Sequence, residues 1–176
     1  MSGWYAVLVG LVGLERLAEL KVARRNLRWS LARGGVESGG DHYPALVALH
    51  VGLLAGCLLE PAFFDRPFLP VLGWPMLVLA AAAQGLRWWC IRTLGPQWNT
   101  RVVVIPGLSR VSRGPYRFSW LPHPNYLAVA VEGFALPLVH SAWMTALAFT
   151  VLNIPVTALR LHTENTALRA LDPREA

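Results

Sequence analysis

Two charged residues near the C-terminal end are spaced for shared chemistry. Arg160 and Glu164 are four positions apart, so on a helix their side chains lie on one face. One interpretation is a salt bridge between them, which would contribute only about 0.2–0.5 kcal/mol. The other is a polar pocket, in which the carboxylate accepts hydrogen bonds from a bound molecule and the guanidinium holds an oxygen atom of that molecule.

Ionisable residues also lie within apolar stretches, where burying them is costly. Glu132 lies in one such stretch and His50 in another. Each is a candidate general base if it reaches a reaction site. Each also has a structural interpretation: an interhelical hydrogen bond for Glu132, and a neutral ring bonded to backbone for His50. The charged stretch from Glu15 to Glu19, which includes Arg16, is interpreted as a self-paired helix end near the membrane interface.

The composition indicates the surroundings of these residues. Hydrophobic side chains make up 55% of the 176 residues, charged ones only 15%, and the mean hydropathy is +0.42. A soluble domain of this size leaves too much surface exposed to hide so many apolar side chains. The composition therefore excludes a small soluble enzyme and a disordered chain, and it predicts an all-α integral membrane protein.

Five apolar stretches predict five transmembrane helices. A span requires about 20 residues, a length that the third and fifth stretches meet best. The fourth stretch is short and lies close to the fifth, which predicts a tight helical hairpin. The stretches cover residues 4–20, 43–59, 68–91, 125–139 and 141–159.

The distribution of basic residues predicts the orientation of these helices. Fifteen of the 16 Lys and Arg residues fall on one side of the predicted membrane, and Arg66 is the exception. The positive-inside rule then places the N-terminus outside and the C-terminus in the cytoplasm, in the inner or plasma membrane of the cell. The net charge of +6 is explained by this topology, so no nucleic-acid partner is expected. Cys57 and Cys90 lack metal-type spacing and are expected to be free core residues, and no metal site is predicted.

The longest polar connection, residues 92–123, divides the chain into two regions. Residues 1–91 form a membrane region with three spans, and residues 92–176 carry the connection, the hairpin and a C-terminal helix. Within the connection, residues 101–105 form a short β-like run. Residues 34–40 are rich in glycine and are interpreted as a flexible loop, since no strand precedes them as a dinucleotide site would require.

Three motifs in the second region resemble the isoprenylcysteine carboxyl methyltransferase family. They are Gly114-Pro115-Tyr116, then His123-Pro124-Asn125-Tyr126 at the start of the hairpin, then the helix that contains Arg160, Glu164, Asn165 and Leu168. The resemblance covers residues 94–168, and the N-terminal part is similar to the small bacterial branch of the family. It implies an integral membrane enzyme that uses S-adenosylmethionine. Members of that branch are associated with methylation of polyketide-type phenolic or pyrone lipids.

The resemblance also implies roles for individual residues. The backbone of residues 108–111 would follow the nucleoside of the cofactor, Glu164 would contact the cofactor, and Arg160 would face the substrate. The chain departs from the family at Pro122, where an arginine is usual, and the loop between Tyr116 and His123 is two residues longer. The implied cofactor-binding residues are Leu108, Ser109, Arg110, Val111, Tyr116, His123, Pro124, Asn125, Tyr126 and Glu164.

The expected function is methyl transfer from S-adenosylmethionine to an oxygen of a lipophilic acceptor drawn from the bilayer. The acceptor would be a prenylcysteine-type carboxylate or a lipidic phenol or pyrone. A carboxylate needs no base, whereas a phenol or enol would benefit from His50 or Glu132. The alternatives are a membrane reductase of the sterol-reductase type, a non-enzymatic transporter or scaffold, and methylation of a phospholipid amine.

Overall fold

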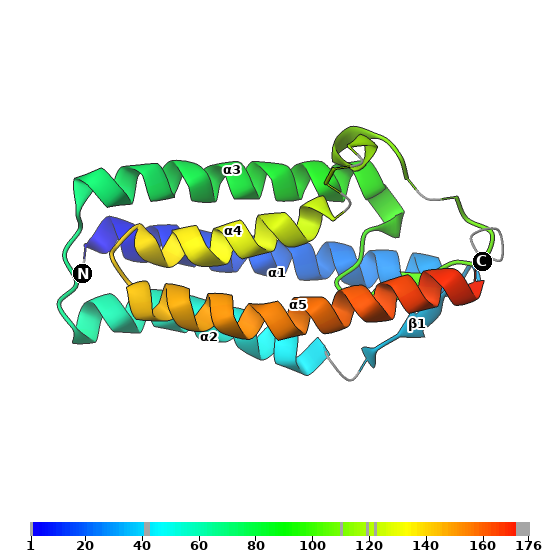
Figure 1. Ribbon diagram of the computed structural model, residues 1–176, viewed down its shortest axis with the longest axis horizontal. Coiled ribbons are helices and arrows are strands. Elements are labelled where there is room, and N and C mark those ends of the chain that lie inside the picture. Colours follow the sequence, from blue (N-terminus) through cyan, green and yellow to red (C-terminus); the bar gives the residue numbers. More distant parts are fainter. Residues whose placement is uncertain (1, 41–42, 110, 119, 122, 172–176) are drawn as a thin grey trace.

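A computed structural model describes residues 2–40, 43–109, 111–118, 120–121 and 123–171 of the chain. Its five α-helices run side by side along one long axis, and the two ends of the chain lie at opposite ends of the bundle (Figure 1). The prediction of an all-α fold is confirmed. The helices are α1 (Gly3–Leu31), α2 (Tyr43–Phe63), α3 (Pro70–Leu94), α4 (Pro124–Leu138) and α5 (Trp143–Leu171).

Apolar packing between helices holds the bundle together. Tyr5, Leu53, Cys57, Leu136 and Phe149 belong to one buried cluster, which joins α1, α2, α4 and α5. A second, smaller cluster joins Ala23, Ile91 and Trp98 at the other end of α1. Both cysteines are buried and free, as expected.

All five expected helices are present, but only some of them are long and apolar enough to cross a membrane. Among the described residues, α2 and α5 are long and apolar enough to span a bilayer. The 15 residues of α4 are short of the usual length, and α1 carries Glu15, Arg16 and Glu19 within its first two thirds. Five transmembrane helices therefore remain a prediction. Exposed Leu11, Val51, Val71 and Ile154 show that helices α1, α2, α3 and α5 all present apolar side chains outward.

Helix α1 is longer than its apolar stretch predicts. The stretch ends near residue 20, whereas the helix continues to Leu31. The basic segment that follows residue 20 contains good helix formers, and its Ala23, Asn26 and Ser30 are buried. The charged group around Arg16 consequently lies in the middle of α1 and not at its end.

The hairpin between α4 and α5 is tight, as predicted. The amide of Ala142 donates to the carbonyl of Pro137 at 3.0 Å, and Ser141 turns the chain with a φ of 58°. Gly133 lets the two helices approach, because a Cβ at this position would lie 1.9 Å from a ring carbon of Phe149. The C-terminal helix expected after the hairpin is the continuation of α5 itself.

A two-stranded ribbon ties the connection between α1 and α2 to the long polar connection. Strand β1 (Val36–Ser38) pairs in antiparallel fashion with β2 (Val102–Val104). The β-like run is therefore confirmed at β2, while the interpretation of residues 34–40 as only a flexible loop is wrong at β1. Arg101, which directly precedes β2, also donates to the carboxylate of Glu37 in β1 at 2.7 Å, and this contact fastens the two segments.

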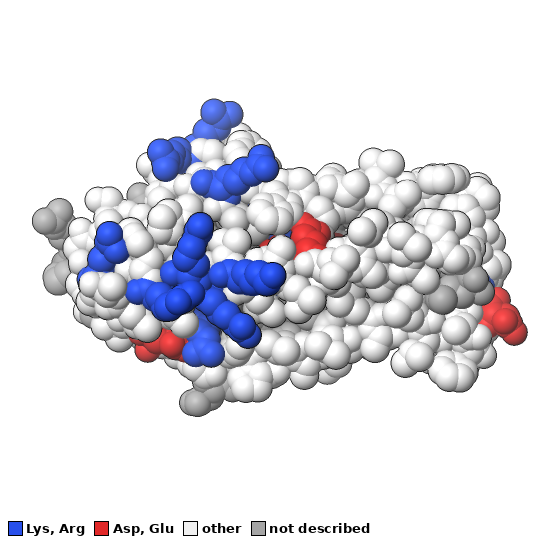
Figure 2. Space-filling model, turned by 180° about the vertical axis from the view of Figure 1, so that it is seen from behind, with Lys and Arg blue, Asp and Glu red and all other residues white. Residues whose placement is uncertain are grey.

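Basic side chains gather at the end of the bundle that carries this ribbon. In Figure 2 the Lys and Arg side chains lie almost entirely over one end of the molecule, and the remainder of that face is largely uncharged. Exposed Lys21, Arg24, Arg25 and Arg28 of α1 belong to this end. The basic end and the largely uncharged remainder of this face agree with the sequence, which predicts that nearly all basic residues lie on one side.

Candidate functional site

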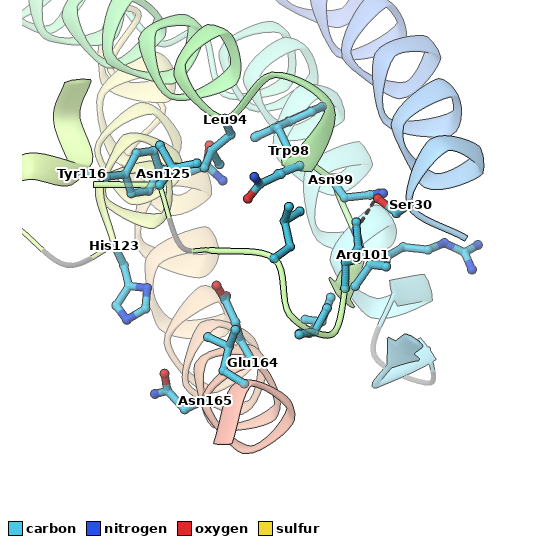
Figure 3. A pocket seen from close by; sticks show the side chains of 18 of the residues that line it. Ser30, Leu94, Trp98, Asn99, Arg101, Tyr116, His123, Asn125, Glu164 and Asn165 are labelled. Atoms are coloured by element: carbon cyan, nitrogen blue, oxygen red, sulfur yellow. Dashed lines mark hydrogen bonds between the residues drawn. The ribbon is translucent and has the colours of Figure 1, made fainter. Parts of the chain in front are cut away.

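A cavity of about 620 Å³ opens at the basic end, and we call it the loop cavity. Figure 3 shows Tyr116 and Asn125 on one side of it, Trp98 and Asn99 on another, and Glu164 of α5 on a third. Pro124 is buried in the first turn of α4 and does not line the cavity, and Arg110 and Pro122 lie outside the described residues. The sequence-predicted residues that line the loop cavity are Leu108, Ser109, Val111, Tyr116, His123, Asn125, Tyr126, Arg160 and Glu164.

Local backbone rules place two of the lining aromatics. Pro124 suits the first position of a helix, so α4 starts there and its first turn presents Tyr126. Gly114 begins a 3-10 helix, η3 (Gly114–Arg117), with a φ of 58°, and a Cβ at this position would lie 2.5 Å from Thr93 Oγ1. That turn presents Tyr116 to the cavity. Burial raises the pKa of the Tyr116 hydroxyl above its usual range, which keeps the hydroxyl neutral.

The hydroxyl of Tyr126 connects the two charged residues of α5. It donates to Glu164 Oε2 at 2.6 Å, and Arg160 Nε donates to it at 3.0 Å. Arg160 Nη2 also lies 3.5 Å from the carbonyl oxygen of Asn99. The shared helix face is thus confirmed, but the interpretation as a direct salt bridge is not supported, since the described residues join these charges through a neutral hydroxyl.

A second cavity of about 210 Å³ lies deeper in the bundle between α1, α2, α4 and α5, and we call it the helix cavity. Most of its lining is apolar, with Leu17, Leu54, Val129 and Val156 among the contributors. His50 lines it too. The Nδ1 of His50 lies 2.8 Å from the carbonyl oxygen of Leu46, which requires a proton on Nδ1 and makes Nε2 the acceptor in the neutral ring.

The loop cavity and the helix cavity meet at a set of residues that we call the shared wall. These residues come from the connection after α3, the first turn of α4 and the middle of α5. Arg160 and Tyr126 belong to the set, so the bridged pair described above faces both cavities. The shared wall consists of Trp98, Asn99, Asn125, Tyr126 and Arg160.

Glu132 occupies a different position from the other predicted site residues. It is 4% exposed and pairs with Arg16 of α1, and it lines neither cavity. Arg16 also donates to Glu19 at 2.6 Å, and Arg87 of α3 donates to Glu19 at 2.7 Å. The interpretation of Glu15 to Glu19 as self-paired is therefore incomplete: its charges are paired across three helices.

The shared wall includes residues to which the sequence assigns no role. Trp98 is 2% exposed, and its carbonyl accepts a hydrogen bond of 2.8 Å from Asn26 Nδ2. The same amide group donates to the carbonyl of Gly95 at 3.0 Å. Asn26 of α1 thereby fixes the segment that presents Trp98 and Asn99. A tryptophan and an asparagine side by side in a polar connection are the only sequence signal for these positions.

Comparisons with known proteins found a matching family model and similar bacterial proteins. A model of the isoprenylcysteine carboxyl methyltransferase (ICMT) family matches residues 76–170, which include the connection, α4 and most of α5. The chain is 32% identical over 164 residues to the uncharacterized protein YpbQ of Bacillus subtilis (strain 168), across 93% of this chain and 95% of that protein. It is 24% identical over 162 residues to an uncharacterized protein of Haemophilus influenzae, across 90% and 91% respectively. No solved structure matches the chain.

Proposed function

Because the chain belongs to the isoprenylcysteine carboxyl methyltransferase family, we propose that it moves a methyl group from S-adenosylmethionine to an oxygen of a lipophilic acceptor. Its family and its two long apolar helices indicate a membrane methyltransferase. One observation supports the proposed donor and acceptor. Two cavities of different character, one with a mixed polar and apolar lining and one mainly apolar, meet at a wall that contains Arg160 and Tyr126.

The loop cavity has the size and the polar groups for the cofactor. Small-molecule sites are usually about 300–1,000 Å³, and this cavity is about 620 Å³. Glu164 offers a carboxylate to hydroxyl or amino groups of the nucleoside, and the rings of Tyr116 and Tyr126 offer faces that attract a cation. Asn125 also lines this cavity. When bound, S-adenosylmethionine supplies a methyl group on a positively charged sulfur.

The helix cavity would hold the acceptor with its reactive oxygen at the shared wall. That oxygen supplies the electron pair of the new carbon–oxygen bond, while the electrons of the broken carbon–sulfur bond stay on sulfur. Arg160 is placed to hold the oxygen, because it lines both cavities and its Nε donates to the hydroxyl of Tyr126. Alignment of the reacting groups in a site that excludes water can supply about 7–11 kcal/mol in favourable cases.

The protonation state of the acceptor decides whether a base is needed. A carboxylate reacts without losing a proton, whereas a phenol or enol must release one. His50 is the candidate acceptor of that proton, because it lines the helix cavity and its Nε2 is the unprotonated nitrogen in the neutral ring. Glu132 is the weaker candidate, since it lines neither cavity and is engaged by Arg16.

The proposed orientation allows both reactants to arrive from their own phase. With the basic end in the cytoplasm, the loop cavity faces the cytosol, where a polar cofactor is dissolved. The exposed apolar sides of the helices then face lipid, from which an acceptor with an apolar tail enters the helix cavity. We place the protein in the inner or plasma membrane, with its N-terminus outside.

The test is a labelling reaction with a matched pair of variants. Detergent-purified protein is incubated with methyl-labelled S-adenosylmethionine and a membrane lipid extract, and the labelled product is identified. The wild type and His162→Ala, which changes an exposed residue of α5 two positions from Glu164, should yield a labelled lipid. Glu164→Ala should yield little. Absence of label with the wild type, together with turnover of a nicotinamide cofactor, would instead support the reductase alternative.

A further inference from the structure

The exposed side of α1 changes from apolar to basic along its length. Its first part presents Val7, Leu11, Leu14 and Leu17 outward, each more than half exposed. Positions three or four apart on a helix share one face, and the residues that continue this face toward the C-terminal end are cations. We call them the basic stripe, which consists of the exposed residues Lys21, Arg24, Arg25 and Arg28.

The basic stripe has no acidic partner among the described residues. None of its four side chains takes part in an ion pair there, whereas Arg16, Arg87 and Arg101 are each paired with a glutamate. The chain also contains no Asp or Glu from position 20 to position 36. Exposed positive charge without a counter-charge on the protein attracts an anionic partner.

The face that carries the stripe indicates which partner this is. A nucleic acid or an acidic protein would account for the cations, but not for the leucines that precede them on the same face. A bilayer accounts for both, because acyl chains cover the apolar part and the phosphates of the head groups meet the cations. The opposite side of this part of α1 is buried at Ala23, Asn26 and Ser30, so the stripe is held facing outward.

The stripe also lies beside the proposed cofactor site. Ser30, two positions after Arg28, lines the loop cavity. S-adenosylmethionine carries one net positive charge, whereas S-adenosylhomocysteine, which lacks the sulfonium, carries none. Cations around the cavity therefore oppose the binding of the cofactor more than that of its product. Three more exposed cations of the described chain lie within two positions of residues that line this cavity, namely Arg92, Arg113 and Arg117.

We infer that the basic stripe binds the phosphate groups of anionic phospholipids in the cytoplasmic leaflet, and that these phosphates offset the positive charge beside the loop cavity. The second part of this inference rests on the proposed methyl transfer. The stripe is then a docking surface for lipid head groups that is separate from the helix cavity, where the acceptor lies. Bound anionic lipid strengthens the binding of the cofactor and has little effect on the binding of its product.

Native mass spectrometry of the detergent-purified protein tests the docking surface. The protein is mixed with equal amounts of phosphatidylglycerol and phosphatidylcholine that have the same acyl chains. The wild type should retain the anionic lipid about tenfold more than the zwitterionic one, because basic side chains attract anionic head groups.

Two multiple variants assign this preference to the stripe. A glutamine variant that combines Lys21→Gln, Arg24→Gln, Arg25→Gln and Arg28→Gln should lose most of it. A lysine variant that combines Arg24→Lys, Arg25→Lys and Arg28→Lys keeps the charge and should keep the preference. All of these changes are at exposed positions. The same preference in the wild type and in the folded glutamine variant would overturn the docking surface.

Titration in nanodiscs tests the effect on the loop cavity. Adding phosphatidylglycerol to phosphatidylcholine discs should strengthen wild-type binding of S-adenosylmethionine about three- to tenfold, and that of S-adenosylhomocysteine less than about twofold. The gain should be smaller in the glutamine variant, which distinguishes docked lipid from general attraction of a cation to an anionic surface. An equal gain for both compounds, or for both proteins, would refute the effect. Failure of the wild type to bind either compound would contradict the methyltransferase function, while the lipid preference measured by mass spectrometry would still decide the docking surface.

Discussion

Arg160 and Glu164 lie one turn apart on α5 and are joined through the hydroxyl of Tyr126, which accepts from the guanidinium and donates to the carboxylate. This arrangement gives the two charges separate tasks. Glu164 can be directed into the loop cavity while Arg160 faces both cavities. A direct salt bridge would instead neutralise both residues within one pair. The Tyr126 hydroxyl therefore links the proposed cofactor site to the proposed acceptor site.

Removing this hydroxyl should weaken both sides of the site. A hydrogen bond to a charged group contributes about 1.5–3 kcal/mol, so Tyr126→Phe should weaken S-adenosylhomocysteine binding by about 10- to 100-fold. Tyr5→Phe is the matched control, because its hydroxyl donates to the carbonyl of Leu136 at the opposite end of the bundle. The control should lower the unfolding temperature without changing the affinity. Equal affinities of Tyr126→Phe and wild type would show that the bridge has no role in binding.

The turn that presents Tyr116 should be sensitive to a single methyl group. Gly114→Ala adds a Cβ 2.5 Å from Thr93 Oγ1 to a residue with a φ of 58°, and the backbone strain alone costs about 1–2 kcal/mol. Gly107→Ala carries the strain without the contact, since Gly107 has a φ of 75° and open space around it. We expect Gly114→Ala to bind S-adenosylhomocysteine more weakly than Gly107→Ala in the same titration. The opposite order would contradict the proposed importance of this turn.

Glu132 should prove important for stability and not for proton transfer. Glu132→Gln removes the negative partner of Arg16, but Arg16 keeps Glu19 at 2.6 Å and Gln84 at 3.2 Å, so the expected loss of unfolding free energy is about 1–3 kcal/mol. Glu37→Gln, at a half-exposed pair with Arg101, should cost less than about 1 kcal/mol. Chemical denaturation in detergent measures both. A Glu132→Gln protein of wild-type stability that methylates a phenolic lipid about 10²- to 10⁴-fold more slowly would identify Glu132 as the base.

His50 should matter only for acceptors that must lose a proton. A positioned general base contributes about 10²- to 10⁴-fold in rate, so His50→Gln should slow methylation of a phenolic lipid by a factor in this range. S-adenosylhomocysteine binding should stay unchanged, because His50 lines the helix cavity alone. His140→Gln, in the turn between α4 and α5, is the control. A phenol methylated at the wild-type rate by His50→Gln would exclude the role.

Sequence patterns predict those parts of the site that are determined by residues close together in the chain. The spacing of Arg160 and Glu164 is sufficient to place them on one face, and the proline at position 124 is sufficient to start α4. The position of Tyr126 between those two side chains depends on how α4 packs on α5, which no periodicity encodes. Asn99 at the shared wall depends in the same way on the path of the connection.

Two segments differ from what their sequence predicts, and both differences arise from contacts with residues that are distant in the chain. Strand β1 has three residues and pairs with β2 more than sixty positions later, so it has too little length for a period-two pattern, and its glycine flanks resemble a loop. The basic half of α1 resembles a membrane-flanking loop by charge, yet it is helical because one face packs on the second region. Asn26 on that face anchors the segment that presents Trp98. The mean hydropathy of this segment is dominated by the charged side chains on its exposed face, so it does not reveal the face that is buried.

Titration of S-adenosylhomocysteine into the detergent-purified protein tests the central claim most directly. The loop cavity predicts a single saturable binding event for the wild type and for His162→Ala, with a strong loss of affinity in Glu164→Ala, because Glu164 is the carboxylate of the cavity lining that Tyr126 orients. The absence of binding to a folded wild-type protein, or the same affinity for wild type and Glu164→Ala, would contradict the account.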